Sequence, residues 1–122
     1  MEESKNPNKE PKGLRYNGDK PKWSLVDFKS LEPMVRVLEY GAAKYTVKDE
    51  SGKVIATGRD NWKNGMIPSE VTESLLRHVF ALLRGEMNDP ESGLPHTGHI
   101  MCNAMFLEYN LQNFPELNDL KK

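Results

Sequence analysis

Residues 68–111 decide the fold of this chain, and they read PSEVTESLLRHVFALLRGEMNDPESGLPHTGHIMCNAMFLEYNL. From 68 to 85, apolar residues recur at the three- and four-residue spacing of a helix, with a capping Ser69 at the start and Gly85 at the end. From about 96 to 111 the same spacing returns. The connection between these segments is short and rich in acids, Gly and Pro, so the two helices are predicted to form an antiparallel hairpin.

A further helix is predicted upstream of this hairpin, over about residues 30–45, where apolar residues again recur at helical spacing. Ser30 is the expected N-cap, and Pro33 falls in the first turn, where proline is tolerated. Gly41 costs up to about 1 kcal/mol relative to Ala inside a helix, so a close backbone approach is expected at this position.

The pattern changes between the first helix and the helical hairpin. Residues 46–58 hold two short β-prone runs around Glu50-Ser51-Gly52, which predicts an exposed β-hairpin. Residues 59–68 form a loop, and its Trp62 needs cover from another part of the chain. The predicted fold class is therefore mainly α, a small helical bundle with an antiparallel helical hairpin and a short inserted β-hairpin.

The chain of 122 residues has the length of one domain. We expect a flexible tail over residues 1–13, a single helical domain over 14–112, and a C-terminal tail over 113–122 in which Pro115 breaks the last helix. Three helices of this length bury a modest core, so a homodimer or larger homo-oligomer is predicted.

Composition excludes several classes of protein. The net charge of -1 argues against capture of duplex nucleic acid, and no apolar run has the roughly 18–20 residues that span a membrane. The N-terminal residues have no apolar core of a secretory signal. A single cysteine, Cys102, excludes a disulfide framework and makes a cytoplasmic setting the expectation. The phosphate-binding and nucleophile motifs of P-loop, Rossmann and α/β-hydrolase proteins are absent.

Histidines and acids gather at the connected end of the helical hairpin. His78 interrupts the apolar face of the first hairpin helix, and the second carries a polar stripe of imidazoles and carboxamides. Folding the hairpin brings these side chains near the acids of the connection. Carboxylate with imidazole suits Mn²⁺, Zn²⁺ or Fe²⁺, whereas carboxylates with water suit Mg²⁺. The set comprises His78, His96, His99, Asn103, Glu86, Asp89 and Glu91. The alternatives are that His78 is a hydrogen-bonded residue at the edge of the core and that the stripe is a solvated face.

The cationic and aromatic residues of the chain are of the kinds that bind a nucleotide, because aromatic rings stack on a base and cations pair with phosphates. Arg77 and Arg84 lie along one stripe of the helix, and Glu39 of the upstream helix adds an acid. Cations next to aromatic residues flank that upstream helix; they are Arg15, Lys20, Lys22 and Trp23 before it, and Lys44, Tyr45, Arg59, Asn61 and Trp62 after it. The alternatives are that Arg77 pairs with Glu73 and that the two tryptophans seal the core.

One acidic string matches the metal-binding signature of MazG-type pyrophosphatases. It runs Glu70-x-x-Glu73, then Glu86-x-x-Asp89. Glu70 and Glu86 would lie on one helix, about 24 Å apart at 1.5 Å per residue. They cannot share a metal within one subunit, so we interpret the match as accidental.

The ordered motifs nevertheless resemble a known family. They are Gly18-x-Lys20-Pro21-x-Trp23-x-Leu25, Glu39-x-Gly41-x-x-Lys44-Tyr45, Arg59-x-Asn61-Trp62-x-x-Gly65, Leu76-Arg77-His78, and Gly85-Glu86-x-x-Asp89-x-Glu91-x-Gly93-x-x-His96-x-x-His99-x-x-x-Asn103. Over about residues 13–110 they resemble the phage-encoded family named for the N-terminal domain of dATP/dGTP diphosphohydrolase. The resemblance implies a helical, MazG-like pyrophosphohydrolase in the cytoplasm of a phage-infected bacterium. Such an enzyme uses Mg²⁺ or Mn²⁺ to cleave purine deoxynucleoside triphosphates to monophosphate and pyrophosphate.

On this resemblance and the residue chemistry, each candidate residue receives an expected role. The catalytic residues would be Glu39, His78 and Arg77, and the metal ligands Glu86, Asp89, His96 and His99. The substrate-binding residues would be Lys20, Trp23, Lys44, Tyr45, Arg59, Asn61, Trp62, Arg84 and Asn103. The segment 46–58 reads as an insertion relative to the family pattern, which could alter substrate access, and no second domain is expected.

Two other functions fit the same residues. An HD-like phosphohydrolase also presents His and Asp from helices, but the adjacent His-Asp dipeptide that it requires is absent. A phage protein that binds or sequesters a nucleotide signal would use the same cations and aromatic residues without a metal.

Overall fold

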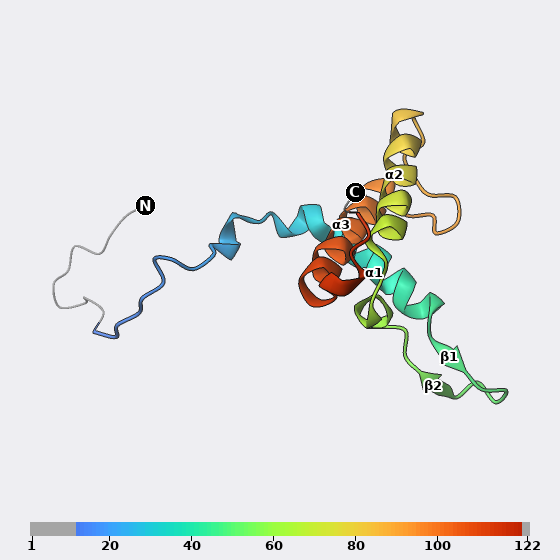
Figure 1. Ribbon diagram of the computed structural model, residues 1–122, viewed down its shortest axis with the longest axis horizontal. Helices are drawn as coiled ribbons and strands as arrows, with labels where there is room; N and C mark the ends of the chain where they lie inside the picture. Colours follow the sequence, from blue (N-terminus) through green and yellow to red (C-terminus); the bar gives the residue numbers. More distant parts are fainter. Residues whose placement is uncertain (1–11, 121–122) are drawn as a thin grey trace.

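The computed structural model describes residues 12–120, so nearly all of the predicted tail over 1–13 lies outside the described residues. The described part is mainly helical, as predicted, with three helices packed together and one small hairpin of two antiparallel strands (Figure 1). The helices are α1 (Glu32–Lys44), α2 (Pro68–Leu83) and α3 (His96–Asn113), and the strands are β1 (Val47–Lys48) and β2 (Val54–Ala56). Short 3-10 turns are η2 (Trp23–Leu25), η3 (Phe28–Leu31), η4 (Asn61–Asn64) and η5 (Pro115–Leu117). None of the helices in this range is long and apolar enough to cross a membrane.

The predicted helical hairpin is α2 followed by α3, and Gly85 ends α2 as expected. Gly85 has a φ of 91°, in the left-handed region that glycine adopts without strain. Its N–H donates to the carbonyl of Leu82, and the N–H of Glu86 donates to the carbonyl of Ala81, both at 2.9 Å. This pair of bonds satisfies the last carbonyls of the helix and turns the chain toward α3.

The expected cap residues of α1 and α2 are corrected by the structure. Ser30 lies inside the 3-10 turn η3, where its backbone N–H donates to the Asp27 carboxylate, and α1 begins only at Glu32. Ile67 takes the N-cap position of α2, and the N–H of Ser69 instead donates to Asp119 at 2.9 Å. The C-terminal segment thus docks on the start of α2 after α3 ends at Asn113, ahead of Pro115 as predicted.

Small residues of α3 let this helix approach α1 closely. A Cβ on Gly98 would lie 2.5 Å from the carbonyl oxygen of Pro33, so no other residue fits there without a shift of the backbone. One turn later the buried Cys102 thiol donates to the carbonyl of Met34 at 3.2 Å, and burial raises its pKa to about 12. The close approach expected at Gly41 is wrong, because no atom lies within 4 Å of a Cβ built there. The close helix contact belongs to Gly98, whereas Gly41 faces open space.

The inserted hairpin β1–β2 projects from the body as an arm, and every residue of its strands is exposed, as predicted (Figure 1). Its base is closed by Thr46, whose hydroxyl accepts from the N–H of Gly58 at 2.9 Å and donates to the carbonyl of Ala42 at 2.6 Å. Beyond the arm, Trp62 finds its cover on α3. Its ring centroid lies 5.0 Å from that of Phe106, in a stacked arrangement.

Candidate functional site

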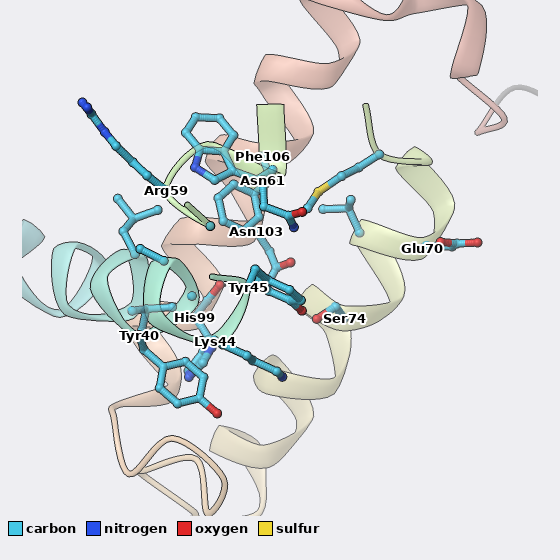
Figure 2. A pocket seen from close by; sticks show the side chains of 18 of the residues that line it. Tyr40, Lys44, Tyr45, Arg59, Asn61, Glu70, Ser74, His99, Asn103 and Phe106 are labelled. Atoms are coloured by element: carbon cyan, nitrogen blue, oxygen red, sulfur yellow. Dashed lines mark hydrogen bonds between the residues drawn. The ribbon is translucent and has the colours of Figure 1, made fainter. Parts of the chain in front are cut away.

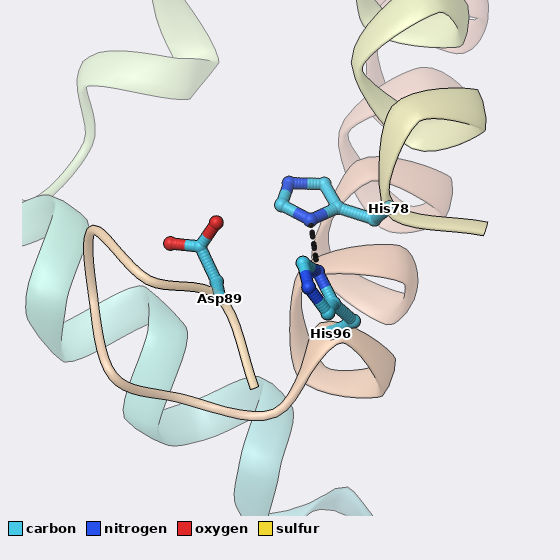
Figure 3. Close-up of side chains that lie close together, drawn as sticks. All are labelled: His78, Asp89 and His96. Atoms are coloured by element: carbon cyan, nitrogen blue, oxygen red, sulfur yellow. Dashed lines mark hydrogen bonds between the residues drawn. The ribbon is translucent and has the colours of Figure 1, made fainter. Parts of the chain in front are cut away.

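Three histidines and one aspartate, here called the histidine cluster, meet at the connected end of the helical hairpin. His78 comes from α2, Asp89 from the connection, and His96 and His99 from the first turn of α3. The Nδ1 atoms of His78 and His96 lie 2.8 Å apart (Figure 3), and the His78 ring stacks on His99 with centroids 4.4 Å apart. The three imidazoles lie together as predicted, with His78 opposite His96. His78 is half-buried and bonded to His96, which fits a site residue and equally fits the alternative of a hydrogen-bonded residue at the edge of the core.

Glu86 fixes the tautomer of His96. Its Oε1 lies 2.8 Å from Nε2 of His96, a side chain that is only 3% exposed. A carboxylate only accepts, so Nε2 carries the proton, and in the neutral ring Nδ1 of His96 keeps a lone pair that is directed at His78. A carboxylate behind an imidazole is the arrangement that orients histidine ligands in metal centres. Glu86 thus contacts the cluster through the ring nitrogen of His96 that faces away from His78.

Ser92 ties Asp89 to His99. Its backbone N–H donates to the Asp89 carboxylate at 2.8 Å, and its hydroxyl lies 2.7 Å from Nε2 of His99. The same hydroxyl oxygen accepts the N–H of Leu94, so its proton is free to be donated to His99. Asp89 Oδ2 lies 3.8 Å from Nε2 of His99. One short turn therefore orders both an acid and an imidazole.

The surroundings favour the neutral form of His78 and His99 and the charged form of Asp89. Burial lowers the pKa of His78 below its ordinary 6.5, and the neighbouring rings of His99 and His96 lower it further. Burial also lowers the pKa of His99, against the opposing charge of Asp89. Burial alone would raise the pKa of Asp89, but the hydrogen bonds from Ser92 and the charges of His99 and His78 prevail and hold it below 3.8. At pH 7, His78 and His99 are neutral and Asp89 is charged.

Three members of the cluster can hold a metal ion. One ligand atom each from His78, Asp89 and His96 lies within 4.8 Å of the others. Two imidazoles and a carboxylate form a mixed nitrogen and oxygen set, which suits Mn²⁺, Fe²⁺ or Zn²⁺ better than the all-oxygen preference of Mg²⁺. The chemistry of the donors therefore fits a divalent transition metal.

A cleft of about 560 Å³ opens beside the cluster. Its walls come from α1, the base of the β1–β2 arm, η4, α2 and α3 (Figure 2). Gly41 leaves room on the side of α1, and apolar residues such as Met66, Val71 and Phe106 line much of the rest. His99 belongs to the lining as well, so the cleft and the cluster adjoin each other through this residue.

Six of the nine expected substrate-binding residues line this cleft. They are Lys44, Tyr45, Arg59, Asn61, Trp62 and Asn103. Arg59 reaches outward, and Figure 2 shows its guanidinium pointing away from the other labelled side chains. Lys20 and Trp23 lie apart, along a separate depression on the N-terminal segment, and Arg84 is the exposed C-cap of α2. Trp23 is 72% exposed, so of the two tryptophans only Trp62 covers the core.

Two of the three expected catalytic residues lie outside the cleft lining and the cluster. The Glu39 side chain is 62% exposed and pairs with Arg36 on the same helix at 3.3 Å. Arg77 is exposed on α2, and among the described residues it has no ion pair, including the alternative pair with Glu73. Of the expected catalytic set, the structure brings only His78 into contact with the other histidines.

The structure adds residues that sequence reasoning missed. Lys44 Nζ donates to Glu91 at 2.9 Å and the Tyr40 hydroxyl donates to the same carboxylate oxygen at 3.1 Å, which ties the connection to α1. Tyr40 precedes Lys44 by one helical turn, a spacing that could have pointed to it. Ser92 follows Asp89 by three residues before a glycine, a pattern typical of side-chain-capped turns.

Comparison with known proteins adds independent findings. Residues 10–120 match the protein family described as "dATP/dGTP diphosphohydrolase, N-terminal". Over 107 residues the chain is 31% identical to the "dATP/dGTP diphosphohydrolase" of Salmonella phage PMBT28, in an alignment that covers 88% of this chain and 32% of that protein. The chain thus spans about a third of the length of this relative, at 32%. No solved structure matches it.

Proposed function

The chain belongs to the dATP/dGTP diphosphohydrolase N-terminal family, as its motifs predicted, and on that premise we propose that it hydrolyses purine deoxynucleoside triphosphates. The products would be the deoxynucleoside monophosphate and pyrophosphate, and the reaction would need a divalent metal ion. One observation carries this proposal: a group able to hold a metal adjoins a cleft of nucleotide size that is lined by a cation, aromatic residues and carboxamides.

The histidine cluster would supply the metal ligands. His78, Asp89 and His96 would bind the ion, and Glu86 would orient His96 through its Nε2–H. A bound divalent ion supplies two kinds of chemistry, since it offsets phosphate charge and lowers the pKa of water.

The remaining residues of the cleft would position the triphosphate and handle the proton. Water attacks the α-phosphorus, the bond to the oxygen shared with the β-phosphorus breaks, and pyrophosphate leaves with that oxygen. His99 lines the cleft, and its neutral ring would accept the proton that the water loses at Nε2, through the Ser92 hydroxyl that lies 2.7 Å from this atom. Lys44 lines the same cleft and would offset the charge that grows on the leaving pyrophosphate.

The test is direct incubation with nucleotides. The purified chain is mixed with dATP or dGTP, with and without Mn²⁺, and the products are separated by chromatography. Formation of monophosphate and pyrophosphate only with Mn²⁺ supports the proposal. Release of other phosphate products would indicate an HD-like reaction, and intact nucleotide recovered with the protein would indicate sequestration.

A pair of variants ties any activity to the cluster. His78→Gln should lower turnover at least about tenfold, because an amide is a weak substitute for an imidazole ligand. Glu73→Gln, on the exposed face of α2, is the control and should keep full activity. Equal activity in both variants would move the chemistry away from the cluster.

A further inference from the structure

The cleft extends along α3 from the histidine cluster. His99, Asn103 and Phe106 all line it, and at 1.5 Å per residue Asn103 lies about 6 Å and Phe106 about 10 Å beyond His99. A nucleotide with its phosphates beside His99 would therefore place its base near Asn103 and Phe106. This inference rests on the proposed function, because that function sets which end of the ligand faces the metal ligands.

The walls at this end suit the flat face of a base. Trp62 and Phe106 are stacked on each other and lie in the lining, together with the thioether of Met66. The Trp62 ring also makes a T-shaped contact with Tyr109, with centroids 5.1 Å apart, so contacts within the protein hold it in place. A rigid aromatic wall stacks on any base and cannot by itself distinguish purines from pyrimidines.

Two carboxamides supply the polar groups that a base edge requires. Asn103 is half-buried, and its Nδ2 donates to the carbonyl of His99 at 2.8 Å, which fixes the orientation of the amide. Its second N–H remains available, because each amide nitrogen carries two donors. Asn61 is exposed at the start of η4, and its side chain makes no hydrogen bond to any residue of the described range. One carboxamide is thus held and the other is free to turn.

We propose that Asn103 and Asn61 divide the recognition of a purine base between them. The fixed Asn103 donates to N7, an acceptor that adenine and guanine share and pyrimidines lack. Asn61 turns to match the substituent at carbon 6, offering its oxygen to the amino group of adenine or its N–H to the oxygen of guanine. Asn103, whose amide is fixed, selects purines over pyrimidines, and Asn61, whose amide can turn, accommodates both adenine and guanine.

The test measures binding without catalysis. Dissociation constants are determined by calorimetry with Mn²⁺ for the α,β-methylene analogues of dATP, dGTP, dCTP and dTTP. The wild-type chain should bind both purine analogues at least about tenfold more tightly than the pyrimidine analogues. Asn103→Leu keeps a similar volume and should bring this ratio close to one. Asn61→Asp presents only acceptors and should favour the dATP analogue over the dGTP analogue by about tenfold.

Controls separate this inference from the proposed reaction. Asn113→Ala removes an exposed carboxamide at the far end of α3, which donates to the carbonyl of Tyr109, and should leave all four affinities unchanged. Unchanged base preference in both Asn103→Leu and Asn61→Asp would overturn the inference even if dATP is hydrolysed. The opposite outcome is also informative. If the chain binds purines through Asn103 and Asn61 but hydrolyses no nucleotide, the inference stands and the proposed reaction is overturned. Asn61 lies on the surface, so its variant tests the inference even if Asn103→Leu folds poorly.

Discussion

His96 shows at the scale of one residue how the chain builds its site. The side chain is buried at 3% exposure, with Glu86 on one ring nitrogen and His78 on the other, each at 2.8 Å. A buried imidazole needs partners for both nitrogens, and a carboxylate on one of them leaves a lone pair on the other. The arrangement gives both ring nitrogens of a buried side chain a partner, and it places His96 in the group that could hold a metal ion.

Glu86→Gln tests the role of the carboxylate behind His96. The amide oxygen still accepts the Nε2–H, so the ring stays in place, but the loss of charge makes Nδ1 a poorer ligand. We expect Mn²⁺ affinity to fall about 10–100-fold with little change in melting temperature. Calorimetric titration measures the affinity, and Glu73→Gln, an exposed acid of α2, is the control. Equal Mn²⁺ affinity in wild type and Glu86→Gln would contradict this role.

Acid should destabilise the metal-free protein in two steps. The pKa values of His78 and His99 lie below 6.5 in the folded state, so between those values and 6.5 the unfolded chain binds more protons and stability falls as pH falls. The lowered pKa of Asp89 acts in the same direction below about 3.8. Each group contributes at most about 1.4 kcal/mol per pH unit.

Melting temperature measured from pH 7.5 to 5 checks the first step. His99→Gln removes one of the titrating rings and should reduce the slope of melting temperature against pH. A melting temperature that is independent of pH in the wild type, or a slope unchanged in His99→Gln, would contradict the assignment.

At the scale of elements, the helices and the hairpin were predictable because their signals are local. Apolar spacing and Gly85 set the bounds of α2, and two β-prone runs around a turn gave the arm. Long-range contacts were harder to predict. Asp119 replaces the expected cap of α2 from fifty residues away, at 2.9 Å from the Ser69 N–H, and the role of Gly98 depends on which helix crosses α3.

The residues of the candidate site also differ in how far the sequence could predict their positions. The hairpin topology placed the histidines together, because two helices joined by a short connection bring their joined ends into contact. Glu39 and Arg77 could not be placed by spacing on their own helices, since their distance from the cluster depends on the rotation of α1 and α2 about their axes.

The β1–β2 arm should be dispensable for folding. All strand residues are exposed, and the contacts at its base come from Thr46 and Gly58. Replacing residues 47–57 with a short Gly-Ser linker should preserve cooperative unfolding, because a doubling of loop length changes the closure cost by only about 0.6 kcal/mol. Thermal unfolding followed by circular dichroism provides the measurement. Loss of the cooperative transition would show that the arm is part of the core or of an interface.

At the scale of the whole molecule, large apolar side chains remain uncovered. Trp23, Leu25 and Phe28 are 72%, 85% and 69% exposed along the N-terminal segment, which extends away from the helices (Figure 1). Leu83 and Met87, near the cluster, are 76% and 65% exposed. Such surfaces are typical of contacts between proteins.

We therefore expect a homodimer or larger assembly in solution. Light scattering at micromolar concentration should give at least twice the chain mass of 13.9 kDa. Replacing Trp23 and Leu25 with serine should lower the measured mass if the N-terminal segment forms the contact. A wild-type mass equal to that of one chain across this concentration range would contradict the prediction.

The central claim is that the histidine cluster holds a divalent metal, and titration of the metal-free chain with Mn²⁺ tests it most directly. Asp89→Asn is the decisive variant, because the amide oxygen still accepts the Ser92 N–H while the charge is lost. Asp60→Asn, which changes an exposed acid next to Lys63, is the matched control. We expect one Mn²⁺ per chain in wild type and Asp60→Asn, and affinity at least about a hundredfold weaker in Asp89→Asn. No binding by the wild type, or equal affinity in all three proteins, would contradict the account.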